Sequence, residues 1–214
     1  PMEPNAAPAE EPDIEEQDLS QSDWTLASTE TVTHEYLTQS GKVVRETITT
    51  SMDTTTLDFF YDESGRPFAF NYTPEGSTPN TYYYILNLQG DVVQIIDEGG
   101  VLQAEYVYSP WGEIISAEGD LAEVNPLRYR GYYYDSETGF YYLQSRYYDP
   151  ANRRFINADG LISSNWSFSG LNMFAYCEND PVGRSDPSGI EKRERFFFTS
   201  SGKQYGQFLK IDGR

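Results

Sequence analysis

The chain has 214 residues, of which 18 are tyrosine and 12 phenylalanine, and its formal net charge at pH 7 is −19. This strongly negative charge argues against nucleic acid and anionic lipid as partners of the whole surface. One cysteine and one histidine exclude an intrachain disulfide and a zinc site built from Cys and His. We expect Cys177 to be a small buried hydrophobic residue and His34 to be structural.

The first 23 residues are acidic and rich in proline. They contain eight Asp or Glu, four Pro and no Lys or Arg. Such a segment cannot bury enough apolar surface to offset its conformational entropy, and its like charges repel. We expect a disordered linker over residues 1–23, with an acidic interaction tail as the alternative. No apolar run of membrane length is visible, so we expect no membrane insertion by this chain.

Residues 24–126 are typical of successive antiparallel hairpins, because runs rich in Thr, Val, Ile and aromatic residues alternate with turns that contain glycine. The expected strands are 31–37, 43–49, 57–61, 67–72, 82–88, 92–97, 101–108 and 113–115. Turn glycines recur at intervals of 25, 22 and 27 residues, at Gly65, Gly90, Gly112 and Gly139. This repetition favours stacked hairpin units that each bury a face against their neighbours.

The densest aromatic segment is residues 128–160, called the signature stretch below, which holds eight of the 18 tyrosines. Two aromatic runs, 129–134 and 140–148, flank a turn. In that turn Asp135 can accept hydrogen bonds from the amides, and Gly139 can take a positive φ. We expect an aromatic hairpin here, then a second turn that returns the chain, and no helix.

The tyrosines of the signature stretch allow two roles. Cross-strand packing is favoured, and we expect Tyr133, Tyr141 and Tyr147 to share an aromatic layer. Exposed aromatic platforms beside polar groups would instead suit sugar rings, as in a module that binds carbohydrate or cell wall. Cation–π layers are expected in either case, because five arginines lie among the tyrosines: Arg128, Arg130, Arg146, Arg153 and Arg154.

The segment YRGYYYDSETGFYYLQSRYYDPANRRFINADG closely resembles the signature of the RHS-repeat-associated core. That core ends the YD-repeat shell of bacterial polymorphic toxins and is related to Tc-toxin C subunits and wall-associated YD-repeat proteins. The resemblance implies an all-β fold, a spiral sheet of antiparallel hairpins that encloses a C-terminal toxic segment. It also implies a secreted or cell-surface location in bacteria. The implied partners are the rest of the shell, the toxic segment and an immunity protein.

After residue 160 the aromatic pattern ends. Residues 171–177 are the best candidate for a short helix, with Phe174 and Cys177 on one apolar face. The Asp-Pro step at Asp180 ends it. The expected organisation is a linker (1–23), a YD-repeat sheet ending in the signature stretch (24–160), a plug with a short helix and Asp-Pro turns (161–190), and the start of a variable tail (191–214).

Asp159 and Asp186 are the candidate catalytic residues. In the RHS and Tc-toxin C families such a pair is thought to cut the chain after an apolar residue, which here implies a cut between Ile190 and Glu191. One carboxyl group would act as the acid, while the other would activate water as the base. The motif at Asp159 lacks its proline, and the spacing is longer than usual. The favoured interpretation is therefore that both aspartates form turns in an open, wet site, and that the chain stays intact.

No phosphate-binding loop, Ser/His/Asp set or metal-ligand cluster is visible, and acidic turns such as Asp62-Glu63 lack the ligand spacing of a calcium loop. We expect no cofactor and no metal, and we expect Asp149 and Asp180 to form turns. The sequence thus predicts a structural shell segment that encapsulates and presents a toxic segment in bacterial competition. The alternatives are a carbohydrate-binding surface module and a self-cleaving aspartyl protease.

Overall fold

The computed structural model describes residues 31–159 and 172–190, together with the backbone of three dipeptides at 193–194, 197–198 and 204–205. The expected linker, the first part of the expected plug and most of the expected tail lie outside these residues. Residues 32–214 form one compact unit, to which every element below belongs.

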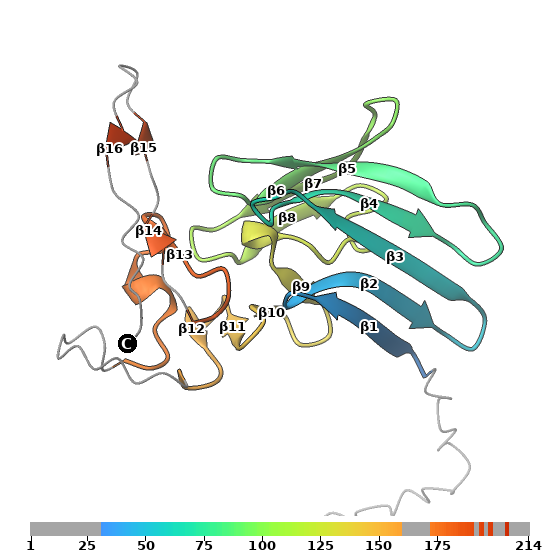
Figure 1. Cartoon of the computed structure of the whole chain (residues 1–214). Helices are drawn as coiled ribbons and strands as arrows, with labels where there is room; N and C mark the ends of the chain where they lie inside the picture. Colours follow the sequence, from blue (N-terminus) through green and yellow to red (C-terminus); the bar gives the residue numbers. More distant parts are fainter. Residues whose placement is uncertain (1–30, 160–171, 191–192, 195–196, 199–203, 206–214) are drawn as a thin grey trace, which may run out of the picture. The chain divides into compact units, whose positions relative to one another are not determined.

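The main element is an eight-stranded antiparallel sheet in which each strand pairs with its neighbour in sequence. Figure 1 shows its strands following one another from blue through green. The strands are β1 (Thr33–Gln39), β2 (Lys42–Thr49), β3 (Thr54–Tyr61), β4 (Pro67–Thr73), β5 (Asn80–Leu86), β6 (Val92–Asp97), β7 (Leu102–Tyr108) and β8 (Ile114–Glu118). The all-β prediction is confirmed, and each of the eight predicted strands corresponds to one of these.

Four turns of the sheet share one construction. The side-chain oxygen of the first residue accepts hydrogen bonds from the backbone N–H groups two and four residues later, and a glycine with positive φ stands between them. Their first residues are Asp62, Asn87, Asp97 and Ser109. The first, second and fourth of these turns join β3 to β4, β5 to β6 and β7 to β8, so they lie at one end of the sheet.

One face of the sheet is the core. Its buried side chains include Leu57, Phe59, Phe70, Tyr84, Ile95 and Tyr106. The segment after β8 crosses this face and is held by buried hydrogen bonds. The Tyr84 hydroxyl donates to Asn125 Oδ1 (2.8 Å), and the Tyr106 hydroxyl donates to the carbonyl of Ala122 (2.9 Å).

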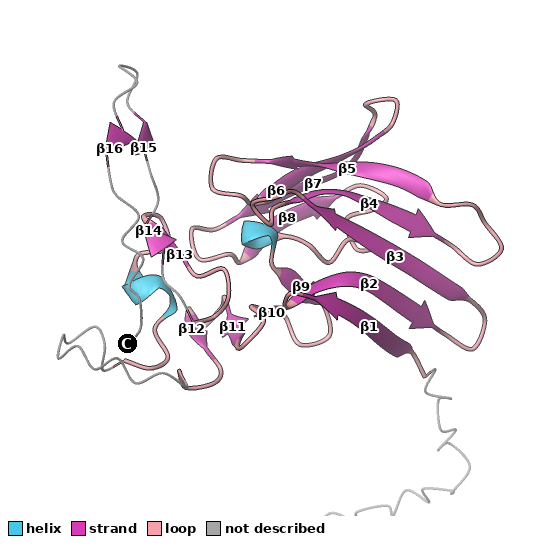
Figure 2. Cartoon of the chain, in the orientation of Figure 1, coloured by secondary structure: helices cyan, strands magenta, loops and turns pink. Residues whose placement is uncertain are grey.

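The signature stretch forms a second, four-stranded sheet in the order β12-β11-β10-β9. Its strands are β9 (Tyr133–Asp135), β10 (Phe140–Tyr142), β11 (Tyr147–Asp149) and β12 (Arg154–Phe155). The hairpin across Gly139 is confirmed, but two other expectations are wrong. Residues 129–131 form a 3-10 turn, η1 (Tyr129–Gly131), drawn in cyan in Figure 2, and residues 143–146 break the second aromatic run. Positive φ values at Arg130 (58°) and Gln144 (64°) cause these two breaks.

The helix expected over 171–177 is also wrong where the structure describes it. Ala175 forms a β-bridge with Arg154, and helical structure starts only at η3 (Tyr176–Asn179). Within η3, Cys177 and Glu178 have left-handed backbone angles, so no right-handed α-helix forms there. Cys177 is fully buried, as expected.

Two short strand pairs follow η3 among the described residues: β13 (Arg184–Ser185) pairs with β14 (Arg193–Glu194), and β15 (Phe197–Phe198) pairs with β16 (Gln204–Tyr205). The helices of the described residues are all too short to cross a membrane.

Candidate functional site

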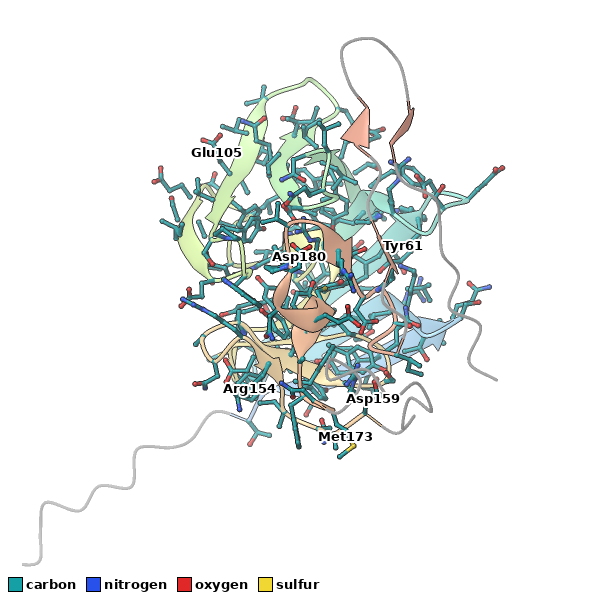
Figure 3. The ribbon with its side chains drawn as sticks, turned by 90° about the vertical axis from the view of Figure 1, so that its left-hand side faces the viewer. Tyr61, Glu105, Arg154, Asp159, Met173 and Asp180 are labelled. Atoms are coloured by element: carbon teal, nitrogen blue, oxygen red, sulfur yellow. The ribbon has the colours of Figure 1, made fainter. Side chains whose placement is uncertain are left out.

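Arg146 joins the two candidate catalytic aspartates. It lies in the turn between β10 and β11, and its guanidinium Nη2 is 3.3 Å from Asp159 Oδ2 and 3.3 Å from Asp186 Oδ2. Figure 3 shows Asp159 beside Met173, in agreement with the hydrogen bond from the Asp159 amide to the Met173 carbonyl (2.9 Å). The two aspartates, 27 residues apart in sequence, therefore share one cation.

The two carboxylates have different surroundings. The Asp186 side chain is completely buried, whereas 18% of the Asp159 side chain is exposed. Burial raises the pKa of Asp186 to about 6, although Arg146 and the amides of Gly189 and Ser188 lower it. Among the described residues, no aligned donor reaches the buried Oδ1 of Asp186. This oxygen is a suitable place for a proton, which makes Asp186 the natural acid of the pair.

The expected open, wet site is therefore not what surrounds Asp186. The Phe155 ring lies 3.5 Å from the Arg146 guanidinium carbon, and the Arg146 Nη1 donates to the Met173 carbonyl (3.1 Å). The Tyr132 hydroxyl donates a hydrogen bond to the backbone carbonyl of Asp186 (3.0 Å). Protein groups enclose the arginine and one aspartate, so the charges act in a medium less polar than water.

A second buried ion pair joins the main sheet to the segment that precedes Asp186. Arg130 Nη1 lies 3.0 Å from Asp91 Oδ1, and both side chains are almost fully buried. The other guanidinium nitrogen of Arg130 donates to the carbonyl of Pro181 (2.6 Å). The arginine of the 3-10 turn thus ties the β5–β6 turn to the segment that leads to Asp186.

The tyrosines of the signature stretch bind the β7–β8 turn. Three buried or nearly buried hydroxyls donate to three successive carbonyl oxygens: Tyr129 to Pro110 (2.8 Å), Tyr148 to Trp111 (2.7 Å) and Tyr141 to Gly112 (2.9 Å). Tyr141 is buried in the aromatic cluster of the signature sheet, whereas Tyr133 packs against the core of the main sheet. The prediction that these two tyrosines share one layer is therefore wrong. Tyr147 is 41% exposed, so the prediction that it belongs to a packed aromatic layer is wrong.

The other aspartates and arginines of interest form turns and contacts with aromatic rings. Asp149 and Asp180 both form turns by accepting backbone amides, from Asn152 and Gly183 respectively. Four of the five arginines lie over an aromatic ring: Arg128, Arg130, Arg146 and Arg153. Within the described residues, no group of three or more acidic, His or Cys side chains is placed to hold a metal ion.

An open pocket of about 310 Å³ lies beside β12. It is lined by Asp149, Asn152, Arg154, Phe155, Ile156 and Phe174. Phe174 is 39% exposed, and polar groups surround it, which is the combination that a sugar-binding site would need.

The teneurin YD-shell family model matches residues 34–182, which is more than half of the chain. The chain belongs to the YD-shell family. The match includes the main sheet from the second residue of β1 onward and all four strands of the signature sheet. The suspected kinship with RHS/YD-repeat proteins is confirmed.

Similar proteins share this YD-shell segment within much longer chains. The tRNA3(Ser)-specific nuclease WapA of Bacillus spizizenii is 39% identical over 135 residues, which are 63% of this chain and 6% of WapA. The double-stranded DNA deaminase toxin A of Burkholderia cenocepacia is 34% identical over 100 residues, which are 45% of this chain and 7% of that protein. The crystal structure of TcdB2-TccC3-TEV has the same fold, with a TM-score of 0.65 and 24% identity over 77% of this chain and 8% of that one.

Proposed function

We propose that this YD-shell segment closes the C-terminal end of a shell that encloses and presents a toxic segment in bacterial competition. The observation that carries the proposal is the set of buried bonds from the signature stretch to the turns of the main sheet. These bonds attach a compact cap to the end of the main sheet at which its hairpin turns lie. A cap of this kind is what a container needs at its end.

The names of the similar proteins support a carrier role. One is a tRNA nuclease and the other a DNA deaminase, although both share this segment. Two unrelated chemistries cannot both come from one shared sheet, so the segment is better understood as the part that carries them. Its partners would be the rest of the shell and the toxic segment, and an immunity protein would neutralise the latter. The location would be secreted or at the bacterial surface.

Limited proteolysis of the complete protein that carries this segment tests the shell role. The toxic segment should resist proteinase K as long as the cap is attached, and should be digested at once in Arg130→Ala, which removes the tie between the β5–β6 turn and Pro181. The matched control is Arg66→Ala, which removes an exposed ion pair with Asp62. Equal digestion in the wild-type protein and Arg130→Ala would contradict enclosure by this cap.

Self-cleavage between Ile190 and Glu191 is a second function that we propose, and the shared Arg146 with its two aspartates favours it. Asp159, the more exposed residue, would take a proton from a water that adds to the Ile190 carbonyl carbon. Asp186, with a pKa of about 6, would give its proton to the leaving nitrogen of Glu191. The bond between the Ile190 carbonyl carbon and the Glu191 nitrogen breaks as the water oxygen joins that carbon. The products are a carboxylic acid at Ile190, an amine at Glu191, a protonated Asp159 and an ionised Asp186, so atoms and charges balance.

Mass spectrometry of the purified chain after incubation at pH 5 and pH 7 tests this reaction. The expected result is a product that ends at Ile190, formed faster at pH 5 and absent from Asp159→Asn and Asp186→Asn. Persistence of the full-length chain at both pH values would overturn self-cleavage and restore turn formation as the role of both aspartates.

A further inference from the structure

Three consecutive residues of the signature stretch bind three consecutive carbonyl groups just before the proposed cleavage site. The Gln144 side-chain amide donates to Pro187 (3.2 Å), the Ser145 hydroxyl donates to Ser188 (2.7 Å), and Arg146 Nε donates to Gly189. The Ser145 backbone amide also donates to the Ser188 carbonyl (3.3 Å). Residues 144–146 are called the carbonyl clamp below.

We propose that the carbonyl clamp is the substrate-positioning element of the self-cleavage reaction, and that Gly189 is its specificity-determining residue. The inference rests on the self-cleavage proposed above and goes further by assigning positioning roles to Gln144 and Ser145. The side-chain hydrogen bonds of the clamp to residues 187–189, called the substrate segment below, are all accepted by backbone carbonyl oxygens. The clamp therefore recognises the path of the chain, and not the identity of the side chain at residue 190.

The space around Gly189 supports its role. It has a φ of +73°, and a Cβ atom there would lie 2.8 Å from the Leu143 carbonyl oxygen and 3.2 Å from the Arg146 nitrogen. These two neighbours are backbone atoms, so they cannot rotate away as a flexible side chain could. The nearest atom, at 2.7 Å, is the hydroxyl oxygen of Ser145 in the clamp itself. Any residue other than glycine would be strained and would also push the segment off the clamp.

The clamp is supported on its far side by the main sheet. A Cβ on Gly41, in the β1–β2 turn, would lie 2.5 Å from Gln144 Oε1, so the missing side chain leaves room for Gln144. Gln144 itself has a φ of 64°, which directs the turn toward Pro187. Contacts from two distant parts of the chain therefore fix the residue that begins the clamp.

Strand pairing holds the two residues that come directly before Asp186. Arg184 pairs with Glu194 and Ser185 with Arg193, so β13 and β14 lie on opposite sides of the Ile190–Glu191 bond. The proposed acid, Asp186, directly follows β13. The clamp thus holds residues 187–189 just before the proposed cleavage site, and strand pairing holds Arg184 and Ser185 just before Asp186. Such fixation is how an enzyme lowers the entropy cost of reaching a reactive geometry.

Cleavage rates of the whole chain, measured by mass spectrometry, test the clamp. Gly189→Ala should slow cleavage about a hundredfold, as expected for a displacement of about 1 Å. The matched control is Gly76→Ala, because Gly76 has a similar φ of +68° with no atom within 4 Å of its added Cβ. Ser145→Ala should slow cleavage about threefold to tenfold, the value of one hydrogen bond, and Ser145→Thr should restore it.

An insertion distinguishes backbone recognition from side-chain recognition. One alanine placed between Gly189 and Ile190 should move the cut to the bond after the inserted residue, because the clamp measures from Gly189. A cut that stays after Ile190 would overturn the proposal. The same is true if the wild-type chain cleaves and Gly189→Ala cleaves at the same rate.

The failure of self-cleavage gives a different result. In that case the wild-type chain itself stays intact, and the positioning role is excluded together with the reaction. Hydrogen exchange on the same sample then shows whether the contacts exist as a purely structural joint. If they do, protection of the peptide around residue 145 will be lower in Gly189→Ala than in Gly76→Ala.

Discussion

Tyr148 and Tyr176 stack face to face, with ring centroids 4.1 Å apart. The first belongs to the signature sheet and the second to η3, and both are fully buried. This stack joins the signature stretch to the segment that leads to Asp186. We expect Tyr176→Ala to destabilise the chain by about 3–5 kcal/mol, as other large truncations in cores do. Chemical denaturation measures this, and a change below about 1 kcal/mol would contradict a structural role for the stack.

Tyr141 and Tyr147 should differ strongly, although they belong to the same aromatic runs. Tyr141 is buried, and Tyr147 is 41% exposed beside Tyr142. We expect Tyr141→Ala to cost about 3–5 kcal/mol and Tyr147→Ala to cost less than about 1 kcal/mol. Tyr141→Phe should cost about 1 kcal/mol, since it removes only the hydrogen bond to Gly112. Equal denaturation midpoints for the two alanine variants would contradict the assigned burial.

Replacing Gly112 should be more harmful than replacing Gly90. Both have a positive φ, 89° and 85°, so both alanine variants carry the same left-handed strain of about 1–2 kcal/mol. A Cβ on Gly112 would also lie 2.7 Å from the Tyr129 ring, whereas nothing lies within 4 Å at Gly90. The difference in unfolding free energy between Gly112→Ala and Gly90→Ala isolates the contact between the turn and the signature stretch. No difference would mean that the Tyr129 ring moves aside freely.

Asp186 should make stability depend on pH. Its pKa is about 6 in the folded chain and 3.8 as its ordinary value, so the folded state holds its proton more tightly. The contribution of Asp186 to the free energy of unfolding is fully present below pH 3.8. It is lost as the pH rises through 6, and the total loss is about 3 kcal/mol. Asp186→Asn cannot ionise and should lose this pH dependence. Denaturation curves at pH 4, 5, 6 and 7 measure it, and parallel profiles for the two proteins would contradict the raised pKa.

The carbohydrate alternative has its own test. Seven of the eight signature tyrosines are buried or partly buried, so we expect no saturable binding to peptidoglycan or polysaccharide. Binding that is stoichiometric, insensitive to salt and lost in Phe174→Ala would instead assign a sugar site to the open pocket beside β12. Tyr83→Ala, at an exposed aromatic residue of β5 outside that pocket, is the control.

The main sheet could be predicted from the sequence because its turns are local. Asp62, Asn87 and Ser109 bind amides no more than four residues away, so the turn chemistry is readable without knowledge of the rest of the fold. Strand pairing between sequence neighbours then follows almost automatically. In the same way, the burial of Cys177 follows from its residue type alone.

The errors arise where distant contacts decide the backbone. Gln144 leaves the strand conformation at a place where it contacts Gly41 and Pro187, which are about a hundred and about forty residues away. Ala175 forms a β-bridge with Arg154 and therefore does not adopt the expected helical conformation. A pairing of Asp159 with Asp186 was available only from the family resemblance, and nothing in the local sequence showed that Arg146 would join them.

The turns at one end of the main sheet have a consequence for the composition of the signature stretch. In each turn, the side chain of the Asp, Asn or Ser that begins it accepts hydrogen bonds from the backbone N–H groups of the same turn. The backbone carbonyl oxygens therefore remain as the groups that a neighbouring segment can bind. A segment that packs against these turns must therefore offer hydrogen-bond donors and few acceptors. The side chains that reach these oxygens are Lys42, Arg130 and three tyrosines. Burial raises the pKa of Tyr129 to about 12, so its hydrogen stays in place at any physiological pH. The abundance of tyrosine and arginine in the signature stretch of this chain thus complements turns whose own N–H donors are already bonded.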